Sequence, residues 1–213
     1  MKSIAYTTLK KSLVRAGATA LTALAVAGGA VQPAVADDTI SFDMVRPAAL
    51  AAFPNCLPNV HAHVTIIPGG PVDQLIVKAV GLPPNTDFDF FVIQVPKAPF
   101  GMSWYQGDFE SNSGGAGLQT YVGRFSIETF VVAPGTAPAP VVFNNAFPDA
   151  SSNPATAPIH TYHLGMWFNS PQDAVKAGCP GTVTPFNGEH NAGVQILNTS
   201  NFPDLQGPLL QVH

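Results

Sequence analysis

Two histidines, His61 and His63, alternate within an apolar run, and their spacing suggests metal chemistry. Alternate residues of a β-strand point to the same face of a sheet, so both imidazoles can reach one transition metal. A later run contains His160 and His163, which fall on opposite faces because they are three residues apart. Only one of these can join the pair, and His163 is the candidate third ligand. The alternative interpretation is a solvent-facing strand whose histidines bind no metal.

A second group of candidate ligands is acidic. Asp108, Glu110 and Asn112 supply side-chain oxygens at alternate positions before a glycine-rich stretch. Calcium takes six to eight oxygen ligands, so this group is a candidate calcium site, with solvated turn residues as the alternative. Asp87 and Asp89 also share one strand face, where they are either paired carboxylates or charges that protect an edge strand.

Three aromatic residues are candidates for ligand binding. Trp104, Tyr105 and Trp167 lie in runs whose opposite face already carries apolar residues for a core. Exposed Trp and Tyr side chains stack on sugar rings and anchor protein interfaces. The alternative is that these side chains belong to the core themselves.

Two stretches of the sequence partly match known catalytic or cofactor-binding motifs, but neither match is complete. The stretch 101–105 begins like a nucleophile elbow, but Tyr105 stands where the second glycine is required. Gly115 and Gly117 do not open a helix, so they do not form a dinucleotide-binding loop. The sequence therefore favours binding over catalysis, without excluding an enzyme.

Short runs of alternating apolar and polar residues, separated by Gly and Pro, predict that β-strands position these side chains. The runs cover 60–67, 75–80, 88–95, 104–110, 118–124, 125–132, 160–168 and 193–197. The stretch 111–117 predicts a hairpin with a flexible tip. Ser170 and Gly178 suit the two ends of one short helix. We expect an all-β fold, a single Ig-like β-sandwich of seven to eight strands, with a closed barrel as the alternative.

The chain begins like an exported protein. Of its 213 residues, 46% are hydrophobic and only 10% are charged. A cationic start, a short apolar stretch and the triplet Ala34-Val35-Ala36 predict a signal peptide at residues 1–36. We expect a poorly ordered lead at 37–54 and the β-sandwich domain at 55–213, with a long Pro/Ala-rich loop at 133–159. The mature chain is expected to be secreted, without a membrane anchor.

The charge balance and the cysteine content bear on the class of binding partner and on the presence of a disulfide. Beyond residue 36 the chain keeps five Lys and Arg against thirteen Asp and Glu, hence a formal net charge of −8. This acidity and the absence of a basic cluster argue against nucleic-acid binding. Cys56 and Cys179 are the only cysteines, and export favours a disulfide between them, with two buried free thiols as the alternative.

Two segments resemble known sandwich families. The stretch 75–92, which contains the turn Gly-Leu-Pro-Pro-Asn-Thr, and the glycine-rich stretch 108–117 resemble fibronectin type III and other Ig-like domains. The same turn, together with 103–108 and 163–171, resembles a group of exported proteins of actinobacteria. The resemblance implies a secreted β-sandwich and transfers no catalytic residue.

These observations predict a secreted binding module for cell-wall or extracellular glycan, or for a surface protein. No cofactor is expected in that case. The alternative is a metal-binding β-fold protein or metalloenzyme that uses His61 and His63, or a calcium-binding protein.

Overall fold

The computed structural model describes residues 38–126, 130–132, 158–186 and 190–213. The expected signal peptide and nearly all of the expected loop at 133–159 lie outside these residues. Among the residues described, no helix is long and apolar enough to cross a membrane.

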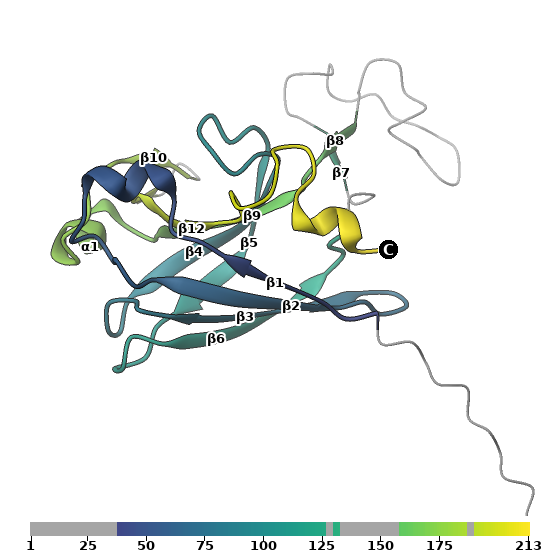
Figure 1. Ribbon diagram of the computed structural model, residues 1–213, viewed down its shortest axis with the longest axis horizontal. Coiled ribbons are helices and arrows are strands. Elements are labelled where there is room, and N and C mark those ends of the chain that lie inside the picture. The colour runs from purple at the N-terminus through teal and green to yellow at the C-terminus, as the bar shows by residue number, and fades with distance from the viewer. Residues whose placement is uncertain (1–37, 127–129, 133–157, 187–189) are drawn as a thin grey trace, which may run out of the picture. The chain divides into compact units, whose positions relative to one another are not determined.

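Two antiparallel four-stranded sheets form the framework of the fold (Figure 1). The first sheet has the order β1-β2-β3-β6, with β1 at Ile40–Met44, β2 at His61–Ile67, β3 at Asp73–Val80 and β6 at Gly117–Gly123. The second sheet has the order β12-β9-β4-β5, with β12 at Gln195–Asn198, β9 at His163–Phe168, β4 at Asp87–Ile93 and β5 at Ser103–Glu110. Their eight strands confirm the predicted β-sandwich, and two separate open sheets replace the alternative closed barrel.

Smaller elements connect and flank the sheets. Two strand pairs, β7 with β8 and β10 with β11, are antiparallel. Their bounds are Phe130–Val132, Pro158–His160, Thr184–Pro185 and Asn191–Ala192. The helices are η1 at Ala48–Ala52, α1 at Pro171–Lys176 and η3 at Pro208–Gln211. The predicted cap of α1 is confirmed, because the backbone N–H of Asp173 donates to Ser170 Oγ over 3.1 Å.

The main core lies between the two sheets and follows from strand alternation. On β2, residues at even positions are buried and both histidines are exposed. The second sheet contributes phenylalanines from β4 and β9, including Phe88, Phe90 and Phe168, all fully buried. β4 is apolar on both faces, because Phe91 and Ile93 belong to a separate cluster on the outer face of the second sheet.

The connection between β5 and β6 differs from the predicted hairpin. β5 pairs with β4 and β6 pairs with β3, so residues 111–116 cross from one sheet to the other. Ser111 is buried, where its Oγ donates to the carbonyl oxygen of Pro83 and accepts from the backbone N–H of Thr86. These bonds tie the crossing to the β3–β4 turn, which explains why the segment is not a free tip.

The expected poorly ordered lead at 37–54 is also corrected by the structure. It contains β1 and η1, and buries Phe42, Met44 and Leu50 in the main core. Just beyond β1, Val45 exchanges two backbone hydrogen bonds with Asn198 of β12. The first strand is therefore an integral part of the sandwich.

The predicted disulfide between Cys56 and Cys179 is confirmed. It joins the segment before β2 to the segment after α1, across a sequence separation of 123 residues. Arg46 supports the same region, since its guanidinium donates to the carbonyl oxygens of Leu50, Phe53 and Cys56.

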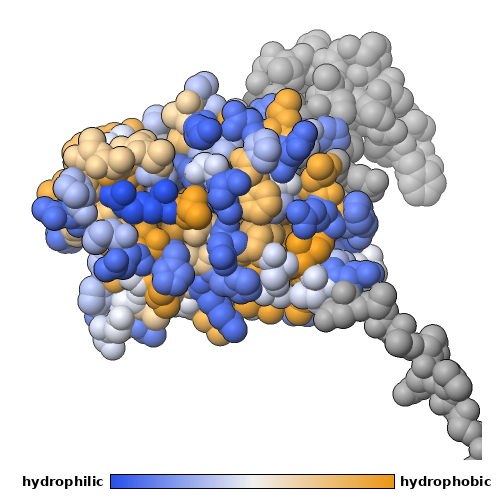
Figure 2. All heavy atoms as spheres, in the orientation of Figure 1, coloured by the Kyte–Doolittle hydropathy of each residue, from blue (hydrophilic) through white to orange (hydrophobic). Residues whose placement is uncertain are grey.

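The surface does not by itself mark a site on the face in view. Figure 2 shows hydrophobic residues interspersed with hydrophilic ones over this face. Scattered exposed apolar residues are normal for a globular protein. A functional site is better sought where the structure encloses a cavity.

Candidate functional site

An aromatic pocket lies on the outer face of the second sheet. Its volume is about 420 Å³, which is within the range of small-molecule sites. It is bounded by the β4–β5 loop on one side and by the segment around β10 and β11 on another. The lining residues are Phe91, Pro99, Phe100, Gly101, Ser103, Tyr105, Trp167, Thr184, Pro185, Phe186 and Ala192.

The aromatic side chains pack edge to face. The Trp167 indole lies 5.2 Å from the Phe91 ring and 5.0 Å from the Phe100 ring, measured between centroids. Phe186 lies 5.3 Å from Phe91 and 5.0 Å from Tyr105. These separations fall in the favourable range for aromatic pairs, so the rings support one another as a wall.

A glycine on β9 makes room for the indole. A Cβ at Gly165 would lie 2.4 Å from a ring carbon of Trp167, closer than real contacts allow. Gly165 faces Phe91 across the β4–β9 ladder. Any side chain at this position would therefore force the indole to move.

A buried carboxylate adjoins the aromatic wall. Asp89 is opposite Trp167 on one neighbouring strand and opposite Asp108 on the other. Its side chain is fully buried, and within residues 38–126, 130–132, 158–186 and 190–213 neither carboxylate oxygen has a hydrogen-bond partner. The pKa of Asp89 is raised to about 6, mainly by burial; His190, whose Nε2 lies 4.0 Å from Oδ2, opposes the shift, and the nearby Asp108 carboxylate adds to it.

Tyr105 connects the aromatic wall to the acidic residues. Its hydroxyl donates a hydrogen bond to Asp108 Oδ1. Burial and this bond both raise the pKa of the Tyr105 hydroxyl well above its usual value. The phenol therefore stays protonated at neutral pH and holds Asp108 beside the pocket.

Two further buried polar groups lie near this wall. Trp167 Nε1 and Gln195 Nε2 make no hydrogen bond to any residue that the structure describes, and their residues are paired across β9 and β12. Unpaired buried donors and acceptors are uncommon in native proteins and are often associated with functional sites. Together with Asp89, they place several buried polar atoms without hydrogen bonds to described residues on this one face of the second sheet.

The three aromatic residues predicted as ligand-binding do not all lie in the pocket. Tyr105 and Trp167 line the pocket, but Trp167 is only 3% exposed and is not the surface side chain that was expected. Trp104 is 55% exposed and does not line the pocket. Two partly buried pocket residues, Phe100 and Phe186, were not predicted, because each lies in a segment without strand alternation.

The histidines predicted as metal ligands do not converge. His61 and His63 share the exposed face of β2, and His63 Nδ1 lies 2.7 Å from Asp43 Oδ1. His163 is instead buried in the second sheet. Within the described part of the chain, no group of three His, Cys, Asp or Glu residues is placed to hold a metal ion.

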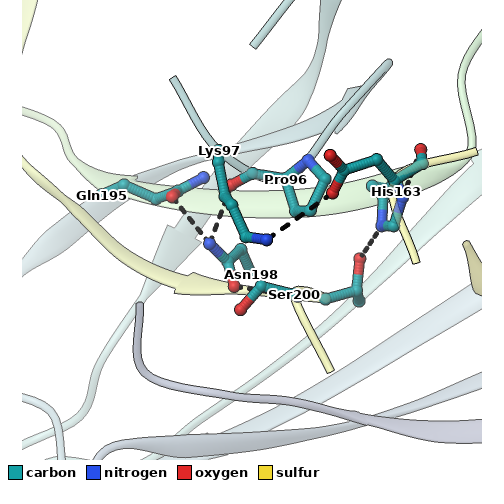
Figure 3. A network of polar contacts seen from close by, with 8 residues as sticks. Pro96, Lys97, His163, Gln195, Asn198 and Ser200 are labelled. Carbon is teal, nitrogen blue, oxygen red and sulfur yellow. Dashed lines mark hydrogen bonds and ion pairs between the residues drawn. The ribbon is translucent and has the colours of Figure 1, made fainter. Parts of the chain in front are cut away.

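His163 belongs to a hydrogen-bonded network that supports the loop beside the pocket (Figure 3). Its Nδ1 lies 2.8 Å from Thr199 Oγ1 and its Nε2 lies 2.9 Å from the carbonyl oxygen of Asp204. Asn198 donates from Nδ2 to the carbonyl oxygen of Pro96, at the start of the β4–β5 loop. Burial lowers the pKa of His163, against the opposing effect of these partners. Because both ring nitrogens contact groups of the fold itself, His163 has a structural role.

The residues of the predicted calcium site have other roles or lie apart. Asp108 accepts the Tyr105 bond, and Asn112 Oδ1 accepts from the backbone N–H groups of Gly114 and Ala116. Glu110 is exposed on β5. The amide oxygen of Asn112 thus shapes the crossing between the sheets.

The fold and the pocket define this chain as an all-β sandwich protein with an aromatic pocket beside a buried acid. No family model matches the chain, and no curated protein is significantly similar to it.

Proposed function

We propose that this protein is an exported, non-catalytic binding module that receives a sugar ring of an extracellular glycan in the aromatic pocket. The observation that carries the proposal is an open pocket of about 420 Å³ whose lining includes five aromatic side chains: Phe91, Phe100, Tyr105, Trp167 and Phe186. Aromatic faces pack against the C–H faces of sugar rings, and polar groups at the rim orient the hydroxyls.

The polar groups around the pocket support a glycan over a purely apolar ligand. Ser103 lines the pocket, and Tyr105 links the aromatic wall to the Asp108 carboxylate. A hydroxyl and a carboxylate can accept hydrogen bonds from sugar hydroxyls. The signal-like residues 1–36 and the disulfide are both consistent with an extracellular location.

Co-sedimentation of the purified exported chain with insoluble peptidoglycan, chitin and cellulose tests this proposal. We expect the protein to pellet with at least one polymer, and Tyr105→Ala to remain in the supernatant. Trp104→Ala is the matched control, because it removes an exposed aromatic from the adjacent position of β5 outside the pocket. Unfolding midpoints of both variants would show that a loss of binding is not a loss of fold.

Two results would contradict the proposal. If the protein stays in solution with every polymer and also binds no soluble oligomer of amino sugars, a glycan is not the ligand and a surface protein becomes the next candidate. If Trp104→Ala abolishes pelleting while Tyr105→Ala does not, binding occurs outside the pocket. The metal alternative is tested by comparing the metal content of the same protein with that of a His61→Ala/His63→Ala variant.

A further inference from the structure

The charged residues are distributed unequally around the pocket. Five Lys and Arg residues follow position 36, and none of them lines the pocket. Four are engaged elsewhere: Arg46 with backbone carbonyls, Lys97 with Asp204, Arg124 with Asp73 and Lys176 with Asp173. The fifth, Lys78, is exposed on β3 in the first sheet. No lysine or arginine that lines the pocket is therefore available to neutralise negative charge there.

Two carboxylates do not line the pocket themselves, but each adjoins a residue that does: Asp89 is opposite Trp167 across β4 and β9, and Asp108 accepts the hydrogen bond from Tyr105. Asp89 and Asp108 are directly opposite each other on β4 and β5. Asp89 lies two residues before Phe91 and therefore on the same strand face as this pocket-lining ring. His190, 4.0 Å from Asp89, is the basic side chain found beside it. A buried charge acts over a longer distance than an exposed one, because surrounding water screens it less.

We propose that the pocket's ligand is a cationic sugar, the ammonium-bearing ring of a glycan whose amino sugars have lost their N-acetyl groups. This inference rests on the proposed glycan-binding function and specifies its ligand. The sugar ring packs on the aromatic wall, whose electron-rich faces also attract a cation. Asp108 and Asp89 complement the ammonium charge, Asp89 through its field because it is fully buried.

A neutral N-acetylated ring lacks this attraction. It offers the same C–H face to the aromatic side chains but gains nothing from the two carboxylates. The difference between acetylated and deacetylated ligands therefore reports on the acidic residues, while binding of either ligand reports on the aromatic wall.

Calorimetric titration with two soluble probes tests the inference. The probes are an oligomer of glucosamine and an oligomer of N-acetylglucosamine of equal length. At about pH 6.5 more than half of the Asp89 carboxyl is ionised, because its pKa is about 6. We expect the glucosamine oligomer to bind about tenfold more tightly or better, a difference that one ion interaction can supply.

Paired variants separate a specific effect from general attraction between an acidic protein and a polycation. Asp89→Asn removes the buried charge, and Asp87→Asn removes an exposed charge from the same face of β4. Both change the formal net charge by one unit. We expect Asp89→Asn to reduce the preference for the glucosamine oligomer about tenfold and Asp87→Asn to leave it nearly unchanged.

The outcomes distinguish this inference from the function on which it rests. Equal affinity for both oligomers, lost together in Tyr105→Ala, would overturn the cationic ligand and retain the glycan module. A preference that Asp87→Asn and Asp89→Asn reduce equally would also overturn it, as general electrostatic attraction. Binding of neither oligomer, combined with no pelleting by any polymer, would refute the glycan function itself.

Discussion

Replacing Asp89 by Asn is expected to change how the stability of the protein depends on pH. Burial raises the pKa of Asp89 from its ordinary value of 3.8 to about 6, so the folded protein holds this proton more tightly than the unfolded chain does. Between these two pH values the folded state binds more protons, and its stability therefore falls as the pH rises. The pKa difference corresponds to about 3 kcal/mol of destabilisation once the carboxyl is fully ionised.

Urea unfolding of wild type and Asp89→Asn at about pH 4 and about pH 7.5 measures this effect. The variant's stability relative to wild type should increase by about 2 to 3 kcal/mol between the two conditions. Taking the difference between proteins removes the contributions of other titrating groups. Asp87→Asn, which changes an exposed carboxyl on the same strand, should show nearly no increase.

A relative stability of Asp89→Asn that is constant with pH would refute the reasoning, because it would mean that the carboxyl titrates alike in both states. The absolute stability of the variant is a separate matter. The new amide lacks partners as the carboxylate did, and an unpaired buried polar group costs about 1 to 3 kcal/mol.

Three further predictions concern stability. Replacing Cys56 and Cys179 by Ala should lower the free energy of unfolding by about 4 kcal/mol in chemical denaturation, since the disulfide closes a loop of more than a hundred residues; an unchanged midpoint would contradict this. Burial lowers the pKa of His163 from 6.5, so the stability that its neutral form provides should decline as the pH falls below that value; His163→Gln should remove this part of the acid sensitivity, and an identical pH profile would oppose the assignment. Asp73→Asn should lower the free energy of unfolding by about 2 to 4 kcal/mol, because the buried carboxylate accepts from the backbone N–H groups of Gly69 and Phe125 and pairs with Arg124; thermal unfolding would test this, and a shift within error would argue against it.

The local sequence pattern was sufficient to predict side-chain orientation where a strand has one buried and one exposed face. On β2 the alternation placed both histidines on one exposed face, as the structure confirms. The short helix was predictable because Ser170 and Pro171 are specific local signals. The disulfide pairing could be predicted without structural information, because the chain contains only two cysteines.

Local pattern failed where the partner of a strand is distant in sequence. Asp89 was predicted as either a paired carboxylate or an edge-strand charge, but β4 lies between β9 and β5 and is buried on both faces. Alternation of apolar and polar residues cannot identify the inward face of a strand that is buried on both faces. The sequence between β5 and β6 likewise indicates a turn and does not specify which strands pair beyond it.

The pocket was accessible to sequence reasoning only in part. Tyr105 and Trp167 were identified by residue type, but their neighbours Phe100 and Phe186 come from loops that meet only in the folded chain. A site assembled from several loops requires the tertiary structure.

The disulfide has a consequence for how the protein is made. A nascent chain emerges with its N-terminus first, so Cys56 becomes accessible well before Cys179, which lies 123 residues later. During that interval the first thiol has no intramolecular partner, and the only wrong disulfides available to it are with other molecules. The backbone bonds between Val45 and Asn198 close at an even later stage of synthesis. Until Cys179 has emerged, the Cys56 thiol is therefore exposed to disulfide formation with other molecules, and its correct pairing requires that such contacts be avoided or reversed.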